Sequence, residues 1–210
     1  MTNHDAPAPD RLQRQLAFVR EVDKLKHVFR RTWLLDGSRL ENDAEHSWHL
    51  ALMTFLLPEY AADERLDVMR VLKMVVVHDL VEIDAGDTYA YDSEGRKTQA
   101  DRELRAADRI FALLPADQAP EFRALWEEFE ARETPEARYA GALDRLQPLM
   151  HNYFTEGRAW REHGVTADQV ITRCQPIEDG SPQLWRYAER LITDAVARGY
   201  LKPAPDGRGG

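Results

Sequence analysis

VVVHDLVEIDAGD, residues 75–87, places a histidine and an aspartate directly behind a run of valines. An imidazole or an ionised carboxylate inside an apolar helical stretch needs a partner that offsets its desolvation. If the helix extends to residue 82, then His78, Asp79 and Glu82 share one face, because positions three and four apart are neighbours on a helix. Neutral imidazole and carboxylate oxygens suit magnesium or a divalent first-row ion. The segment is therefore a candidate metal site.

Two further polar positions occur in apolar, helix-like stretches elsewhere in the chain. His46 lies in DAEHSWH (43–49), and Asp144 lies in GALDRLQP (141–148). If these side chains met the His-Asp pair, the four would pack poorly as a core but well around a metal ion. Each also has an ordinary explanation. A lone helical histidine is more often a hydrogen-bonded residue than a ligand, and Asp144 could form a surface ion pair with Arg145, of little energetic value.

Most of the remaining chain shows the period of amphipathic helices. One apolar stripe recurs every three or four residues near the N-terminus, at Leu12, Leu16, Val19, Val22, Leu25 and Val28. Further helices are predicted at residues 42–57, 67–80, 98–114, 119–131, 136–158 and 182–199. VLKMVVVH (71–78) has the β-branched content of a strand, but its length and its helical neighbours favour a helix. The prediction is an all-α fold.

The helical pattern covers residues 10–200, which we predict to form a single domain. The ends, 1–9 and 201–210, are rich in proline, glycine and aspartate and are predicted to be flexible. Residues 85–97 break the helical pattern with glycines, tyrosines and aspartates. Because a long loop inside a domain is often functional, we expect this one to form a lid or a wall of a substrate site.

Composition limits the classes of function. A chain of 210 residues with 43% hydrophobic side chains suits one sizeable domain. The net charge of −9 argues against binding to nucleic acid or an anionic membrane surface, and no apolar run approaches the roughly 20 residues of a membrane span. The single cysteine, Cys174, excludes an intramolecular disulfide and is expected to be a small core residue. A cytoplasmic protein is expected.

Four segments together resemble the HD-domain metal-dependent phosphohydrolases, and most closely their 5′-deoxynucleotidase branch. They are LKHVFRRTW (25–33), ENDAEHSWHLALM (41–53), VVVHDLVEIDAGD (75–87) and LLPADQAPEFRALWEEFEARETPEARYAGALDRLQ (113–147). That family is all-α, and its metal ligands follow the order H…HD…D. The resemblance extends over residues 12–155 and implies a single HD-domain helical bundle with a metal site in its core.

Position by position, the resemblance implies roles for individual residues. The ligands of one divalent metal ion (Mn, Mg, Co, Zn or Fe) match His46, His78, Asp79 and Asp144. The catalytic acid matches Glu82, and the aspartate that supports the site and contacts substrate matches Asp87. The phosphate-contacting arginine matches Arg31, while Arg30 adjoins it and Trp33 follows after Thr32 as a further candidate substrate contact. His49, one turn beyond His46, either contacts substrate or packs.

The implied activity is the release of phosphate from deoxynucleoside 5′-monophosphates, by a homodimer as in the bacterial relatives. Water attacks a doubly charged phosphomonoester very slowly without help. A divalent ion polarises a phosphoryl oxygen, and the planar donors of Arg31 clamp the others. Glu82 either orients or deprotonates the attacking water or protonates the leaving 5′-oxygen.

Other functions fit the same pattern less well. The alternatives are a phosphohydrolase for another nucleotide or phosphate ester, an iron-dependent HD-type oxygenase with His49 as an extra ligand, and a non-catalytic HD module. The intact set of predicted ligands argues against the last of these. TYAYDSEGRK (88–97) diverges from the family, so base and sugar preference stay open.

Overall fold

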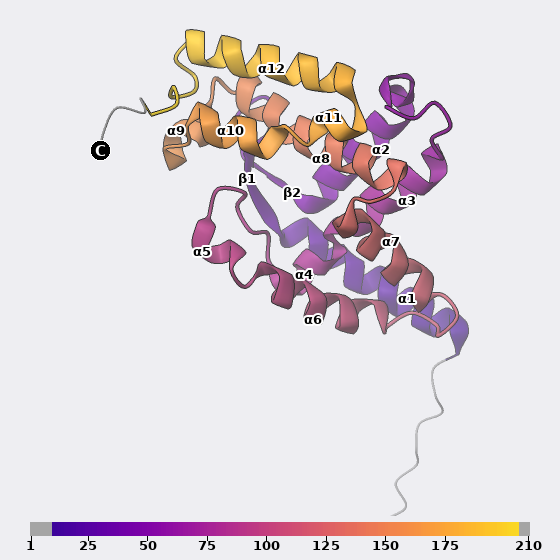
Figure 1. The fold of residues 1–210 in the computed structure, drawn as a ribbon. Helices are drawn as coiled ribbons and strands as arrows, with labels where there is room; N and C mark the ends of the chain where they lie inside the picture. The colour runs from indigo at the N-terminus through magenta and orange to yellow at the C-terminus, as the bar shows by residue number, and fades with distance from the viewer. Residues whose placement is uncertain (1–9, 206–210) are drawn as a thin grey trace, which may run out of the picture.

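Helix α8 (Pro135–Phe154) lies at the centre of the fold, because almost every face of it is apolar or small. Its buried residues include Tyr139, Leu143 and Leu146, each at most 1% exposed. The computed structural model, which describes residues 10–205, arranges the other helices around this one (Figure 1). A helix that is apolar on all sides needs cover on all sides, so α8 organises the core.

The described residues form helices and one short hairpin. The helices that precede α8 are α1 (Arg11–Val22), α2 (Asp43–Leu56), α3 (Val68–Val77), α4 (Glu82–Ala85), α5 (Ser93–Arg96), α6 (Gln99–Phe111) and α7 (Ala119–Ala131). Those that follow it are α9 (Arg158–His163), α10 (Ala167–Cys174), α11 (Ile177–Gly180) and α12 (Pro182–Ala197). The 3₁₀ segments are η1 (Asp23–His27), η2 (Pro58–Tyr60) and η3 (His78–Val81). The hairpin pairs β1 (Phe29–Trp33) antiparallel with β2 (Leu40–Asn42).

Two apolar clusters hold these helices together. The larger one packs α8 against α2, α3, α10 and α12, and includes Leu50, Val75 and Ile192. The smaller one lies among α1, η3, α6 and α7, and includes Phe18 and Ile110. In Figure 1, α10, α11 and α12 form the upper layer, while α1, α4 and α6 lie below, with β1 and β2 between them. The η3 segment, which carries the His-Asp pair, thus belongs to the smaller cluster. It directly follows α3, which contributes to the larger cluster.

Local sequence determines where α2 begins and where α3 gives way to the 3₁₀ segment η3. The Asn42 side chain accepts from the Glu45 amide, and the Glu45 carboxylate accepts from the Asn42 amide in return, so α2 begins with a capping box. Helix α3 ends at Val77, and the chain tightens into η3 before the single turn of α4. Such 3₁₀ stretches between helical segments often occur at functional positions.

The predicted all-α class is confirmed, and the predicted helices correspond to α2, α3, α6, α7, α8 and α12. The helix predicted at 136–158 ends earlier, at Phe154, and α9 begins after Gly157. The hairpin, α10 and α11 were not predicted. Within residues 10–205, no helix has both the length and the apolar character that a membrane span requires.

Two predictions about the ends of the chain need correction. Leu12, Leu16 and Val19 are 61%, 52% and 63% exposed, so the first half of the N-terminal apolar stripe is uncovered, whereas Leu25 in its second half is buried in the smaller cluster. The predicted flexible tail begins too early, because Leu201 is buried and the Lys202 carbonyl accepts from an amide of α10. The flexibility predicted for 1–9 and for the last five residues, 206–210, concerns positions outside the described part of the chain.

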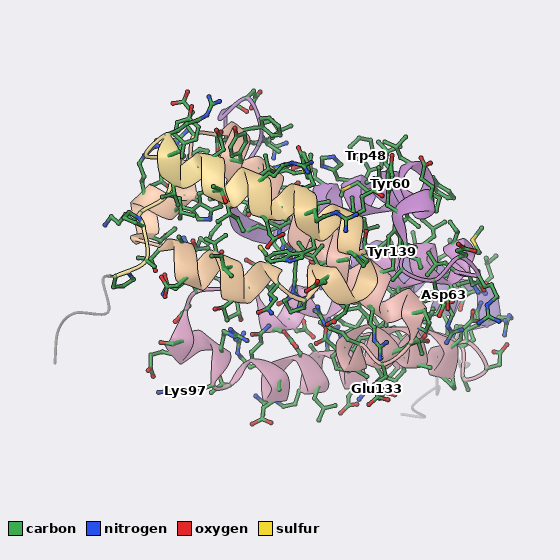
Figure 2. All side chains as sticks on the ribbon, turned by 45° about the horizontal axis from the view of Figure 1, so that its top comes forward. Trp48, Tyr60, Asp63, Lys97, Glu133 and Tyr139 are labelled. Atoms are coloured by element: carbon green, nitrogen blue, oxygen red, sulfur yellow. The ribbon has the colours of Figure 1, made fainter. Side chains whose placement is uncertain are left out.

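Two of the buried side chains support the core, whereas one large aromatic side chain lies at the surface. Tyr139 Oη donates to the Leu57 carbonyl at 2.6 Å, which ties the centre of α8 to the end of α2. Cys174 is buried, as predicted for a small core residue. Trp48, by contrast, lies at the surface of α2 and is 67% exposed (Figure 2).

Two left-handed glycines that flank α9 offer a matched test of this packing. Gly157 and Gly164 have φ of +70° and +67°, but a methyl group on Gly157 would collide with the Tyr200 carbonyl, whereas one on Gly164 meets open space. Gly164→Ala should cost only the left-handed strain of about 1–2 kcal/mol. Gly157→Ala should lower Tm at least twice as far in thermal unfolding. An equal loss in both variants would show that the chain end is not packed there.

Candidate metal centre

The four predicted metal ligands, His46, His78, Asp79 and Asp144, come together from α2, η3 and α8. His46 Nε2 lies 3.2 Å from Asp144 Oδ1. His78 Nε2 lies 3.1 Å from Asp79 Oδ1 and 3.8 Å from Asp144 Oδ1. His46, His78 and Asp79 can each present one ligand atom within 4.8 Å of the others. Asp144 is 6% exposed, which excludes the surface ion pair considered as its ordinary explanation.

The hydrogen bonds of the two histidines point their free lone pairs at the same place. His46 Nδ1 faces the Gln147 side-chain oxygen at 3.0 Å, and His78 Nδ1 faces the Val75 carbonyl at 3.0 Å. Both Nδ1 atoms must therefore carry the proton, which leaves both Nε2 atoms as acceptors. When both imidazoles are neutral, two acceptor nitrogens and two carboxylate oxygens converge with no donor among them. This arrangement fits a cation, and the mixed nitrogen and oxygen set can hold a divalent metal ion.

Electrostatics at the site show the same need for positive charge. Burial by itself would lower the pKa of His78, but Asp79 and Asp144 raise it to about 9. Burial and the nearby Arg30 charge lower the pKa of His46 to about 4, so this ligand stays neutral. Burial is also outweighed at Asp144, where the His46 hydrogen bond and the His78 charge hold the pKa well below its ordinary value. Because metal ligands must be deprotonated, a metal ion would displace the His78 proton.

A buried amide behind His46 fixes the orientation of that ligand. Gln147 Nε2 donates to Glu41 Oε1 at 2.7 Å and to His151 Nε2 at 3.0 Å, so its oxygen must face His46. His151 in turn donates from Nδ1 to the Trp33 carbonyl at 3.0 Å. Gln147, Glu41 and His151 are at most 3% exposed. This chain of contacts sets the tautomer of His46 and points its lone pair at the proposed metal.

The same amide occupies the centre of a second group of polar side chains. Glu41, His49 and His151 could also present ligand atoms within 4.8 Å of one another. Gln147 Nε2 lies 3.3 Å from His49 Nδ1 and donates to the other two residues. An amide nitrogen cannot bind a metal as a neutral donor group, so this group is organised around Gln147. His49 therefore belongs to the support behind His46.

Arg30 lies among the acids rather than in open cavity space. Its Nη1 donates to Asp43 Oδ1 at 3.0 Å and to Asp79 Oδ2 at 2.9 Å, and it lies 3.8 Å from Asp87 Oδ1. Burial opposes its charge, but Asp79, Asp87 and Asp43 hold the pKa of Arg30 well above its ordinary value. One fixed cation thus neutralises part of the acid cluster and orients Asp79 from the side opposite His78.

Glu82 is the acid whose protonation is most strongly changed. It is 7% exposed, and its Oε2 is buried without a hydrogen-bond partner among residues 10–205. Burial, followed by the charges of Asp79 and Glu103, raises the pKa of Glu82 to about 10. Burial likewise raises the pKa of Asp87, although Arg30 opposes the shift. With a pKa of about 10, the Glu82 carboxyl holds a proton at neutral pH.

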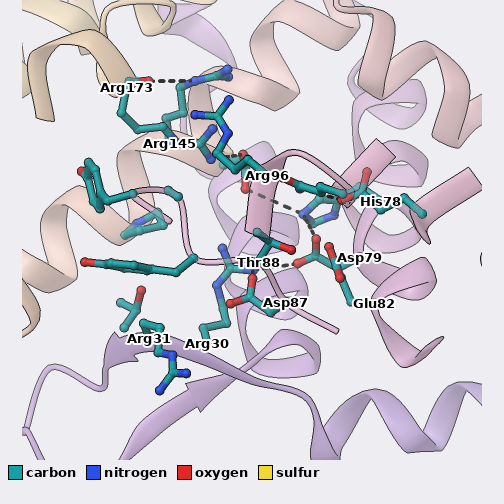
Figure 3. Close-up of a pocket in the computed structure, with 18 of the residues that line it drawn as sticks. Arg30, Arg31, His78, Asp79, Glu82, Asp87, Thr88, Arg96, Arg145 and Arg173 are labelled. Carbon is teal, nitrogen blue, oxygen red and sulfur yellow. Dashed lines mark hydrogen bonds and ion pairs between the residues drawn. The ribbon is translucent and has the colours of Figure 1, made fainter. Parts of the chain in front are cut away.

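A cavity of about 440 Å³ opens in front of these acids. Figure 3 shows His78, Asp79 and Glu82 at one side of it. Arg30 and Arg31 lie at another side, and Tyr89 and Tyr91 of the predicted loop also line it, as expected for a substrate wall. Trp33 does not line this cavity. Its ring lies 3.2 Å from the guanidinium carbon of Arg158, and its Nε1 donates to Glu162.

Several site residues were not predicted. Glu41 directly precedes Asn42, the N-cap of α2, and Gln147 lies three residues after Asp144 on the same helix face. The spacing of Gln147 was the one signal that could have found it. Asp43, at the start of α2, and Glu103, in α6, look in the sequence like ordinary charged helix positions.

Removing the Gln147 amide tests its support of His46. Gln147→Leu should leave the fold intact but weaken binding of Mn²⁺ by roughly 10- to 100-fold, the usual cost of losing a partner behind a metal ligand. Titration calorimetry on the metal-stripped protein measures this change. Gln183→Leu, at an exposed position of α12, is the control. Unchanged affinity in Gln147→Leu would contradict the assignment.

Comparison with known proteins places the chain in a family. A model of the HD domain family matches residues 22–185. The human protein named 5′-deoxynucleotidase HDDC2 is 32% identical over 136 residues, which are 64% of this chain and 65% of that protein. The fission yeast (Schizosaccharomyces pombe) 5′-deoxynucleotidase hdd1 is 27% identical over 137 residues, 63% of this chain and 67% of its own length. This chain thus spans slightly less than two thirds of the human relative.

Solved structures agree with this placement. The crystal structure of a predicted metal-dependent phosphohydrolase from Magnetospirillum magnetotacticum MS-1 is 56% identical and has a TM-score of 0.88, covering 92% of this chain and 96% of that one. The PH0347 protein from Pyrococcus horikoshii OT3, with 23% identity, a TM-score of 0.58 and coverage of 87% and 99%, supports the fold alone. The family match over residues 22–185 and the helical bundle around the four acceptor groups show that this chain belongs to the HD domain family.

Proposed function

We propose that the protein is a metal-dependent phosphohydrolase that removes phosphate from deoxynucleoside 5′-monophosphates. The observation that carries this proposal is the convergence of two imidazole nitrogens and two carboxylate oxygens beside a cavity with arginines. The names of the human and yeast relatives support the substrate, and the name of the Magnetospirillum protein supports the reaction class.

The proposed ligands of one divalent metal ion are His46, His78, Asp79 and Asp144. When bound, such an ion supplies Lewis-acid polarisation of a phosphoryl oxygen. The donor set accommodates Mn, Mg, Co, Zn or Fe, because imidazole and carboxylate together do not select among them. Arg30 holds Asp79 in place, so this carboxylate keeps one fixed orientation.

Arg31 is the proposed phosphate contact. Neighbouring residues of a strand point to opposite faces, and the side chain of Arg30 is already held by Asp43 and Asp79. Arg31 is exposed and lines the cavity, which leaves its donors available to an incoming phosphate. A planar guanidinium can donate two parallel hydrogen bonds to phosphoryl oxygens. Trp33 faces Arg158 and Glu162 instead, so we assign it no substrate contact.

Glu82 is the proposed general acid. With a pKa raised to about 10, it carries a proton that it can donate to the leaving 5′-oxygen as the phosphorus–oxygen bond breaks. Neutralising Asp79 with a bound cation would bring this pKa down towards neutral pH, where a general acid works best. Asp87, 3.8 Å from Arg30, is proposed to hold that arginine in position and to contact the substrate.

Two further parts of the proposal concern assembly and location. We propose a homodimer, supported by an exposed apolar stripe on α2 in which Trp48, Leu52 and Phe55 are 67%, 49% and 56% exposed. We propose a cytoplasmic location, supported by the single cysteine, Cys174, which is buried and unpaired. The packed region of residues 10–202 is proposed to act as one domain.

Replacing Glu82 tests the reaction and the role of this acid together. In metal-stripped protein supplied with each metal in turn, release of phosphate from deoxynucleoside 5′-monophosphates should be seen with at least one of them. Glu82→Gln should lower kcat by roughly 10²- to 10⁴-fold, because it cannot donate the proton, and should keep the metal content. Glu133→Gln, on an exposed residue, is the control. Full activity in Glu82→Gln would exclude the acid role, and no release with any metal would exclude the proposed function.

A further inference from the structure

A group of arginines forms the wall of the cavity beyond the metal centre. Arg96 comes from α5, Arg145 from α8 and Arg173 from α10, and all three line the cavity. Figure 3 shows them together on the side away from Arg30 and Arg31. Arg173 Nη2 lies 3.8 Å from Asp144 Oδ2, so this arginine wall begins directly beside the proposed metal centre.

These arginines are poorly neutralised compared with others in the molecule. Among residues 10–205, no carboxylate oxygen lies within 4.0 Å of the Arg96 or Arg145 guanidinium, and the 3.8 Å approach of Asp144 is the ion pair of Arg173. Arg145 donates instead to two carbonyls, those of Arg173 and Gly141, both at 3.0 Å. Asp144 is itself a proposed metal ligand. The arginine wall therefore has an excess of positive charge that is not balanced within the described chain.

Gly141 of α8 leaves space for Arg145 of the wall and a further arginine, Arg132, to approach each other. A methyl group at Gly141 would lie 2.8 Å from Arg132 Nη1 and 3.1 Å from Arg145 Nη1, so both guanidinium groups reach this glycine. Arg132 Nη1 is buried without a hydrogen-bond partner among residues 10–205. Burial lowers the pKa of Arg132 although the charges of Asp144 and Glu130 oppose the shift, and the charge of Arg173 adds to it. Like charges this close are destabilising unless an anion lies between them.

The arginine wall also borders a second space. Arg96, Arg145 and Arg173, with Tyr91, line an adjoining pocket of about 380 Å³ together with Gln169 and Thr172. None of the four proposed metal ligands and neither Glu82 nor Asp87 lines this pocket. The arginines therefore lie between the reacting centre and a separate space, a position suited to a part of the ligand that is not itself cleaved.

We propose that the arginine wall is a second phosphoryl-binding subsite, so that besides deoxynucleoside 5′-monophosphates the site takes, and binds more tightly, nucleotides with a second phosphoryl group that is not removed. This rests on the proposed phosphohydrolase function. Water attacks the phosphorus of the phosphoryl group beside the proposed metal ligands. The bond between this phosphorus and the leaving oxygen breaks, and the leaving oxygen takes up a proton. The second phosphoryl group stays uncleaved on the arginines. The guanidinium groups of Arg96 and Arg145, which no carboxylate of residues 10–205 pairs, together with Arg173 suit a phosphoryl dianion better than a singly charged carboxylate.

Binding to the metal-loaded Glu82→Gln protein tests the subsite separately from turnover. Equilibrium dialysis should compare one deoxynucleoside as its 5′-monophosphate, its 3′,5′-bisphosphate and its 5′-diphosphate. At least one two-phosphate form should bind about 10-fold or more tightly than the monophosphate, equivalent to about 1.4 kcal/mol. The form that does so shows where the second phosphoryl group is attached. This comparison remains informative even if the protein hydrolyses none of them.

Variants of the arginine wall make the test specific. Arg96→Gln and Arg173→Gln should each reduce the ratio of two-phosphate to monophosphate affinity by several-fold, and Arg96 is exposed, so its replacement should not disturb folding. Lys97→Gln, next to Arg96 but ion-paired with Glu94 and outside both pockets, should leave the ratio unchanged. A ratio near one in the parent protein, or a ratio unaffected by both arginine variants, would overturn the subsite.

Discussion

Two imidazoles and two carboxylates that face one another in the interior are the constraint on which this structure depends. The Nε2 atoms of His46 and His78 and the carboxylates of Asp79 and Asp144 come from helices α2 and α8 and from the tightened segment η3. Unpaired buried acceptors and charges are costly, so this arrangement needs positive charge at its centre, which either the His78 proton or a metal ion can supply. In that sense a metal ion would link the three segments of the fold as well as serve the reaction.

Several buried polar side chains hold these imidazoles and carboxylates in place. Gln147 fixes the proton of His46, Glu41 fixes the orientation of Gln147, and Arg30 holds Asp79. The accompanying acids are shifted strongly: burial raises the pKa of Asp43 to about 8 and, despite the opposing charge of Arg30, that of Glu41 to about 7. Such concentrations of like charge lower stability and are typical of functional sites.

Sequence could predict the centre of the candidate site because its proposed ligands are polar residues in otherwise apolar helical stretches. His46, His78, Asp79 and Asp144 stand out for that reason, whereas Gln147 is an uncharged residue that any buried helix tolerates. The arginine wall was not predicted, because arginines are common on surfaces and only the fold brings α5, α8 and α10 together. Hydrophobic period also has a limit: it identified an apolar face near Leu12 but could not tell whether another part of the chain covers it.

Anomalous diffraction from crystals grown with Mn²⁺ tests the central claim most directly. We predict one peak per chain, within roughly 2.0–2.4 Å of His46 Nε2, His78 Nε2 and one carboxylate oxygen each of Asp79 and Asp144. A peak held by Glu41, His49 and His151 instead, or one that leaves His46 or Asp144 outside its ligands, would contradict the account.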